Sequence, residues 1–163
     1  MRALIALVLC TASCSTARPS STPAPSVCVL PPRESARPGD PDTTNLAGDP
    51  LAVCSVHPMT GVHRDGRCAT GRDDRGVHVV CAQVTDAFLR YTRERGNDLV
   101  TPAGDFPGLR PGDRWCLCAA RWAEAAADGA GPPVVLDATA AAALRTVSRA
   151  TLMTHALPAA PRK

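Results

Sequence analysis

The stretch VHVVC at residues 77–81 decides the fold, because its β-branched residues are followed at once by signals for a helix. A valine-rich run of this length is typical of a strand. Thr85 then has the character of a helix N-cap, and Gly96 has that of a helix end. Phe88 and Tyr91 recur on one helical face between them. The sequence therefore predicts a strand joined directly to an amphipathic helix.

The same alternation returns further along the chain. Residues 115–118, WCLC, predict a second strand, and the alanine-rich residues 119–128 predict a second helix. Residues 134–136 follow two prolines and predict a third strand. We expect Thr139 and Ser148 each to cap one further short helix. Strands that alternate with helices in a chain of 163 residues indicate one α+β domain with helices layered on a sheet.

Two loop regions connect these elements. Residues 45–75 are rich in Gly, Asp and Pro and predict turns, with one hairpin near residues 64–66. Residues 97–113 form a polar, proline-marked loop, and long ordered loops often carry function. The candidate ligand-binding residues are His78, Asn97, Asp98, Asp113 and Arg114. The alternative is that the two aspartates cap turns and that the arginine pairs with one of them.

The N-terminus has the pattern of a bacterial export signal. Residues 1–13 combine one positive charge, an apolar run and small residues, as secretory signal peptides do. The apolar run is shorter than the roughly 20 residues that a membrane-spanning helix needs. Residues 11–14, TASC, resemble the lipobox, in which the cysteine is lipidated and becomes the mature N-terminus. We therefore predict a lipid on Cys14, with ordinary cleavage and secretion as the alternative.

A spacer and one domain follow the predicted anchor. Residues 14–42 contain seven of the sixteen prolines, and such a segment cannot bury enough apolar surface to offset its ordering entropy. It is predicted to be a disordered tether, followed by the folded domain at residues 43–157 and a flexible tail at residues 158–163. We expect a cell-envelope protein that is held to a membrane through its lipid and faces outside the cytoplasm.

Composition and motifs exclude several functions. The net charge of +3 and the charged fraction of 20% argue against a nucleic-acid partner. The sequence has no phosphate-binding glycine loop, nucleophile elbow or zinc-protease motif. We therefore predict a noncatalytic module whose loop surface, residues 54–75 and 97–114, binds a small ligand or an envelope protein. A hydrolytic enzyme is the alternative if Asp98, Asp113 and His78 meet in one pocket.

The eight cysteines carry the remaining chemistry. Signal cleavage removes one and lipidation uses another, and disulfides persist outside the cytoplasm. One of the six that remain, Cys28, lies in the tether, and we expect it to pair with the odd thiol of the domain. The candidates for disulfides, or for a metal or thiol site, are Cys28, Cys54, Cys68, Cys81, Cys116 and Cys118.

A metal or reactive-thiol site competes with the disulfides. Cys116 and Cys118 are two residues apart, so both thiols face the same side of a strand, and Cys81 on the preceding strand offers a third ligand. Another cysteine or a histidine completes a set for zinc or cuprous copper. His78 should point away from Cys81 on a regular strand. The third possibility is that these thiols are inert and buried.

Five sequence blocks resemble one family in their order. They are PMTG at 58–61, HVVCA at 78–82, GNDL at 96–99, PGDRWCLCA at 111–119 and PPVVL at 132–136. Together they resemble the bacterial family called domain of unknown function 2237, over about residues 45–157. The resemblance implies a small two-layer α/β sandwich. It implies no activity, cofactor or catalytic residue.

Overall fold

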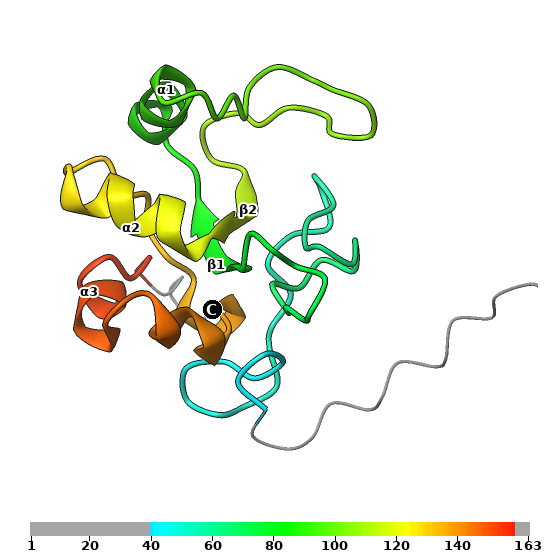
Figure 1. The fold of residues 1–163 in the computed structure, drawn as a ribbon, viewed down its shortest axis with the longest axis vertical. Helices are drawn as coiled ribbons and strands as arrows, with labels where there is room; N and C mark the ends of the chain where they lie inside the picture. The colour runs from blue at the N-terminus through cyan, green and yellow to red at the C-terminus, as the bar shows by residue number, and fades with distance from the viewer. Residues whose placement is uncertain (1–39, 159–163) are drawn as a thin grey trace, which may run out of the picture. The chain divides into compact units, whose positions relative to one another are not determined.

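The computed structural model describes residues 40–158, and this part of the chain forms an α+β domain as predicted. The predicted signal peptide, the lipid on Cys14, nearly all of the tether, Cys28 and the tail beyond residue 158 lie outside the described residues. The elements are β1 (His78–Gln83), α1 (Asp86–Glu94), β2 (Arg114–Cys118), α2 (Ala119–Ala127), η1 (Leu136–Ala138), η2 (Ala141–Arg145) and α3 (Arg149–Thr154). Figure 1 shows the three α-helices on one side of β1 and β2, the segment before β1 on the other side, and the 97–113 loop running out from α1.

Strands β1 and β2 pair antiparallel and form the sheet of the described domain. Cys81 lies directly opposite Cys116, and His78 lies opposite Cys118. A bulge or irregularity interrupts the register between His78 and Val80. The four central residues of β1, from Val79 to Ala82, are fully buried, which explains why this part of the strand is continuously apolar.

Helix α1 begins where the sequence predicts. The Thr85 hydroxyl accepts a hydrogen bond from the Phe88 backbone N–H at 3.1 Å, as an N-cap does. Phe88 and Leu89 are buried, and Gly96, with φ +78°, leads the chain away from the helix. Local capping therefore fixes both ends of α1.

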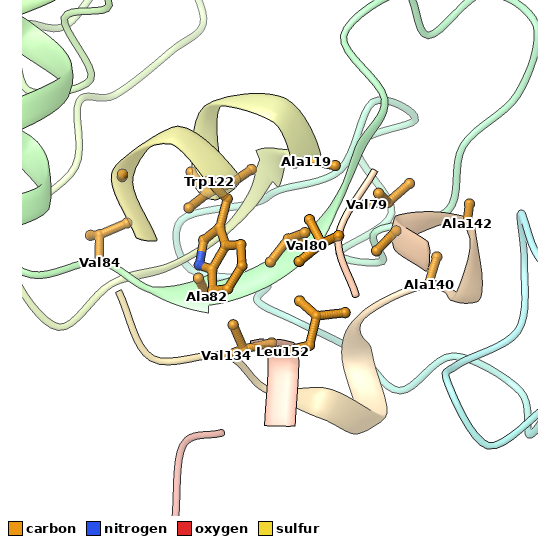
Figure 2. Packing of buried hydrophobic residues seen from close by; sticks show 14 of the residues in the cluster. Val79, Val80, Ala82, Val84, Ala119, Trp122, Val134, Ala140, Ala142 and Leu152 are labelled. Carbon is orange, nitrogen blue, oxygen red and sulfur yellow. The ribbon is translucent and has the colours of Figure 1, made fainter. Parts of the chain in front are cut away.

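Helix α2 follows β2 without a loop and carries the largest core residue. Trp122 is fully buried, and its indole N–H donates to the Pro132 carbonyl at 3.1 Å. Figure 2 shows Trp122 with Val80, Val134 and Leu152 in the main apolar cluster. The core thus joins β1, α2 and the C-terminal segment around one aromatic side chain.

The third strand predicted at residues 134–136 is wrong. Val134 makes only isolated bridges, antiparallel to Ala82 and parallel to Ala156, and η1 begins at Leu136. The Val135 N–H still donates to the Cys81 carbonyl of β1 at 2.8 Å, but the chain turns into η1 at the next residue, so the pairing ends after one bridge.

Of the two predicted caps, one is confirmed and one is wrong. The Ser148 hydroxyl accepts from the Thr151 N–H at 3.0 Å and caps α3. Ala140, not Thr139, precedes η2, and no side chain caps that segment. The Thr139 hydroxyl instead accepts a hydrogen bond from Cys81 N–H at 3.1 Å, 58 residues away in sequence.

The hairpin predicted near residues 64–66 is also wrong. The segment forms turns in which Gly66, with φ +79°, donates its N–H to the Thr60 carbonyl at 3.0 Å.

No helix in the described part of the chain has the length and apolar character that a membrane crossing requires.

Candidate functional site

Four cysteines form a buried cluster beside the sheet. Cys54 is bonded to Cys81 with an S–S distance of 2.05 Å, and Cys68 is bonded to Cys116 with an S–S distance of 2.10 Å. All four are at most 3% exposed. The sulfurs of Cys54, Cys68 and Cys81 lie within 4.8 Å of one another. Of the three fates that the sequence left open for these cysteines, the structure has disulfides.

Two threonines that sequence analysis did not single out hold the strand cysteines in place. The Thr60 hydroxyl accepts from the Cys116 N–H at 2.9 Å, and the Thr139 hydroxyl accepts from the Cys81 N–H at 3.1 Å. Both threonines are fully buried. A threonine 56 residues from its partner carries no local sequence signal, so only the folded chain reveals this role.

Cys118 does not join the cluster with Cys116. It is half-buried and forms no disulfide among residues 40–158. The odd thiol of the domain is therefore Cys118, and its expected pairing with Cys28 stays a prediction because Cys28 lies outside the described residues.

His78 is fixed by a buried carboxylate that sequence analysis missed. Asp74 accepts from the His78 backbone N–H at 2.7 Å, and its other oxygen lies 2.6 Å from His78 Nδ1. The Thr70 hydroxyl donates to the same carboxylate at 2.9 Å. Burial raises the pKa of Asp74, but the hydrogen bonds from His78 and Thr70 together lower the pKa below its usual value. Asp74 is therefore an ionised partner for the imidazole.

The polar residues of the 97–113 loop mainly organise its backbone. Asp98 accepts from the N–H groups of Val100 at 2.8 Å and Thr101 at 3.0 Å, and these bonds lower the pKa of Asp98 to about 2. Asp113 accepts from the Arg110 N–H at 2.8 Å. These contacts match the turn-capping part of the alternative. The expected pairing with Arg114 is wrong, because the arginine that lies beside Asp98 is Arg93, at 3.4 Å.

The other predicted polar residues are not gathered into one site. The Asn97 N–H donates to the Thr92 carbonyl at 2.8 Å, and Arg114 lies exposed on β2 opposite Gln83. No hydrogen bond or ion pair within residues 40–158 joins His78, Asp98 and Asp113.

Trp115 connects the two predicted loop surfaces. The Arg64 guanidinium lies 5.4 Å from the Trp115 ring, and the Phe106 ring packs edge-on at 5.4 Å. Around Arg64, the 53–62 segment exposes four apolar side chains. They are Val53, Val56, Met59 and Val62.

A shallow pocket of about 260 Å³ lies between α1 and the 97–113 loop. Leu89, Val100 and Leu109 supply its apolar lining. Its charged lining consists of Asp86, Arg90, Arg93 and Arg110. The pocket therefore combines apolar surface with an excess of positive charge.

The comparisons with known proteins identify a family. No curated protein matches the chain with significance. A family model described as "Uncharacterized protein conserved in bacteria (DUF2237)" matches residues 44–156, which include the strands and helices of the described domain and its four bonded cysteines. The chain belongs to this bacterial family, as the five sequence blocks suggest.

Proposed function

We propose that the chain is an exported, lipid-anchored protein whose domain acts as a noncatalytic binding module at the cell envelope. The export pattern of residues 1–13 and the lipobox-like sequence ending at Cys14 support the location. The two buried disulfides support it independently, because such bonds persist in oxidising compartments.

The pocket beside α1 is the proposed ligand site. The observation that supports it is the unpaired guanidinium of Arg110 in the pocket lining. Arg90 is paired with Asp86, and Arg93 lies 3.4 Å from Asp98, so neighbouring carboxylates already hold two of the three cations. The Arg110 guanidinium has no hydrogen-bond or ion-pair partner in the described chain. Its charge is therefore available to a ligand.

The pocket lining defines the class of ligand. A guanidinium recognises a carboxylate or a similar anion through paired N–H donors, while apolar side chains bind a hydrocarbon portion. At about 260 Å³ the pocket has room for a short chain only. The proposed ligand is a small anionic amphipath, such as a short-chain carboxylate or the acidic end of an envelope molecule.

An octanoate titration followed by NMR tests the ligand site. Octanoate should shift the methyl signals of Val100 and Leu109, whereas uncharged octanol should bind at least about tenfold more weakly, because a charged hydrogen bond contributes roughly 1.5–3 kcal/mol. Arg110→Glu should abolish the shifts. Arg72→Glu is the matched control, since Arg72 is exposed outside the pocket. Equal binding by the two variants, or by octanol and octanoate, contradicts the proposed site.

Cell fractionation tests the location separately. The native protein should be found in the membrane fraction, and its N-terminal peptide should begin at an acylated Cys14. Cys14→Ser should release the protein from the membrane. Recovery of the native chain from the cytosol with Met1 intact and no acyl group refutes the export proposal, whatever the octanoate result.

A second candidate function rests on the sulfur cluster. If the domain is kept reduced, the thiolates of Cys54, Cys68 and Cys81 are close enough to share one zinc or cuprous ion. Metal analysis of protein purified anaerobically tests this function. A stoichiometric metal that is lost in Cys68→Ser and retained in Cys118→Ser supports it, and metal-free protein with both disulfides formed rejects it.

A further inference from the structure

The segment before β1 presents a group of apolar side chains to solvent. Val53, Val56, Met59 and Val62 are each between 41% and 45% exposed. Val53 and Val56 meet over Gly66, because a Cβ added to this glycine would lie 3.3 Å from Cγ1 of both valines. Met59 is joined to Val56 by a backbone bridge. Val53, Val56 and Met59 therefore form one apolar patch, and contiguous exposed apolar surface of this kind marks an interaction site.

The backbone under the apolar patch is held in place. Cys54, between the two valines, is bonded to Cys81 of β1 and donates its N–H to the Gly66 carbonyl at 2.8 Å. The Gly66 N–H donates to the Thr60 carbonyl at 3.0 Å, and the Thr60 hydroxyl accepts from the Cys116 N–H of β2. The patch is therefore preorganised, and a partner binds it without the entropy cost of ordering a loop.

An arginine and a tryptophan border the apolar patch. The Arg64 guanidinium donates to the Met59 carbonyl at 3.2 Å and lies 5.4 Å from the centre of the Trp115 ring. Trp115 is half-buried. Tryptophan is enriched where hydrocarbon meets lipid headgroups, and arginine places its stem on apolar surface while its charge stays in the polar layer. An apolar centre with such a border suits the surface of a lipid bilayer.

The charges near the apolar patch favour an anionic partner. Residues 53–67 contain one acidic residue, Asp65, which accepts a hydrogen bond from the Arg67 backbone N–H at 3.1 Å. The same stretch has four exposed basic or imidazole side chains, which are His57, His63, Arg64 and Arg67. Its net charge is therefore positive, and positive charge beside apolar side chains is attracted to anionic lipids.

The size of the patch also favours a lipid surface over a protein. Its side chains are each less than half exposed, so together they offer far less than the roughly 800 Å² that each partner buries in a stable protein interface. A domain that is anchored to a membrane needs no such area. Residues 15–39 separate the proposed lipid on Cys14 from the described domain, and a chain of this length spans at most about 90 Å. The anchor keeps the local concentration of membrane high, so a weak contact is sufficient.

We propose that the apolar patch docks the domain onto the anionic phospholipid surface of the membrane that anchors the chain. Val53, Val56 and Met59 enter the boundary between headgroups and acyl chains, and the Arg64 guanidinium pairs with a lipid phosphate. The inference rests on the proposed membrane location and is independent of the pocket beside α1. Docking gives the domain one orientation on the membrane, which a flexible anchor alone does not.

The experiment supplies the anchor chemically, so that it does not depend on acylation in the cell. The full chain with Cys10→Ser, Cys28→Ser and Cys118→Ala keeps Cys14 as the single thiol outside the two disulfides. Cys14 is coupled to a maleimide lipid in nanodiscs made from equal parts of phosphatidylglycerol and phosphatidylcholine. The nanodiscs also contain a lipid with a nitroxide on its headgroup, which broadens NMR signals of nearby protein groups.

The two methionines of the described domain are the probes. Met59 lies in the apolar patch and is 42% exposed, whereas Met153 lies on α3 and is 58% exposed. The nitroxide lipid should broaden the methyl signal of Met59 much more than that of Met153. Nanodiscs of pure phosphatidylcholine should reduce this contrast, because they lack the anionic headgroup. Random motion of the anchored domain broadens both signals alike.

Two substitutions test the apolar and cationic parts of the patch. Val56→Asp should reduce the Met59 broadening at least about fivefold, because it replaces buried apolar surface with a charge that anionic lipids repel. Leu144→Asp on η2 is the matched control, since Leu144 is also exposed. Arg64→Gln should reduce the broadening about fivefold, as the loss of one basic residue near an anionic surface does. Its matched control is Arg121→Gln on α2.

Each outcome supports or overturns the docking. Equal broadening of Met59 and Met153 overturns it, and so does unchanged Met59 broadening in Val56→Asp with both disulfides formed. If Val56→Asp does not fold, Val53→Asp takes its place with the same criteria. Sedimentation of the lipid-free chain as a dimer that Val56→Asp dissociates assigns the patch to a second copy of the chain and also overturns it.

Failure of the docking is distinguishable from failure of the proposed location. An acylated Cys14 in the native protein, with no contrast between Met59 and Met153 on nanodiscs, overturns the docking and leaves the location standing. A native chain that is cytosolic and not acylated overturns both, because the domain then has no membrane beside it.

Discussion

Cys81 and Cys116 are direct partners across the β1–β2 ladder, and yet each is bonded to a cysteine outside the sheet. Cys81 bonds to Cys54 and Cys116 bonds to Cys68, so two disulfides link the sheet to the first and last residues of the 54–68 segment. This segment contains no helix or strand and makes its own structure from turns. The disulfides therefore hold in place the loop that carries Arg64 and the exposed apolar side chains.

Removal of either disulfide should destabilise the oxidised domain. The bonded cysteines are 27 and 48 residues apart, and loop-closure entropy gives about 3.5 and 4 kcal/mol for chains of these lengths. The double variant Cys54→Ala/Cys81→Ala should lower the unfolding free energy by a large part of the first amount. The double variant Cys68→Ala/Cys116→Ala should lower it by a large part of the second. Urea unfolding without reductant measures the loss.

Cys118→Ala is the matched control for the two double variants. It removes a thiol that neither of these two disulfides uses, and it should leave the urea midpoint close to that of the parent. With reductant present, the parent should approach the stability of the disulfide variants. A parent whose unfolding is unaffected by reductant would show that the disulfides contribute nothing to stability.

Removing the Thr60 hydroxyl should be costly although the side chain keeps its shape. Thr60→Val leaves the buried Cys116 N–H without its acceptor, and an unsatisfied buried donor costs roughly 1–3 kcal/mol. Thr60→Ser keeps the hydroxyl and should lose less stability, through the missing methyl group alone. Thermal unfolding of the two variants measures the difference. Equal stability of Thr60→Val and the parent would contradict the role given to the hydroxyl.

The elements that the sequence predicts well are those set by near neighbours. Thr85 and Ser148 each accept a hydrogen bond from the backbone N–H three residues later. Their role as helix caps can therefore be predicted from a few neighbouring residues. The WCLC strand, β2, is likewise confirmed, because its residue types match the strand signals locally. Fold class follows from the order of such elements.

The features that sequence analysis misses depend on distant partners. Thr139 has the residue type of a cap, but its hydroxyl serves Cys81, which is 58 residues away. In the apolar 134–136 stretch Val134 is fully buried and yet the stretch forms no ladder, because burial and strand pairing are separate conditions. Asp74 lies among turn residues, and only the folded chain shows that it orients His78.

Gly76 should be intolerant of a side chain. A Cβ at this position would lie 2.1 Å from His78 Cε1, so Gly76→Ala must displace the imidazole from Asp74. We expect lower stability and altered His78 ring signals in NMR spectra. Gly71→Ala is the matched control, since nothing lies within 4 Å of its added Cβ. Unchanged His78 signals in Gly76→Ala would show that the ring is not held in this place.

Asp98 should make the domain sensitive to acid. Backbone hydrogen bonds from Thr101 and Val100 lower the pKa of Asp98 from the usual 3.8 to about 2, so the folded domain binds this proton less readily than the unfolded chain. The stabilisation from the charged carboxylate is therefore complete above about pH 4 and is lost as the pH falls toward 2. Asp98→Asn should be less stable than the parent at pH 7, and the difference should shrink steadily through this window in urea unfolding experiments. A difference between the two proteins that stays constant from pH 7 to 2 would contradict the assignment, because a loss of packing alone does not depend on the protonation of one carboxyl group.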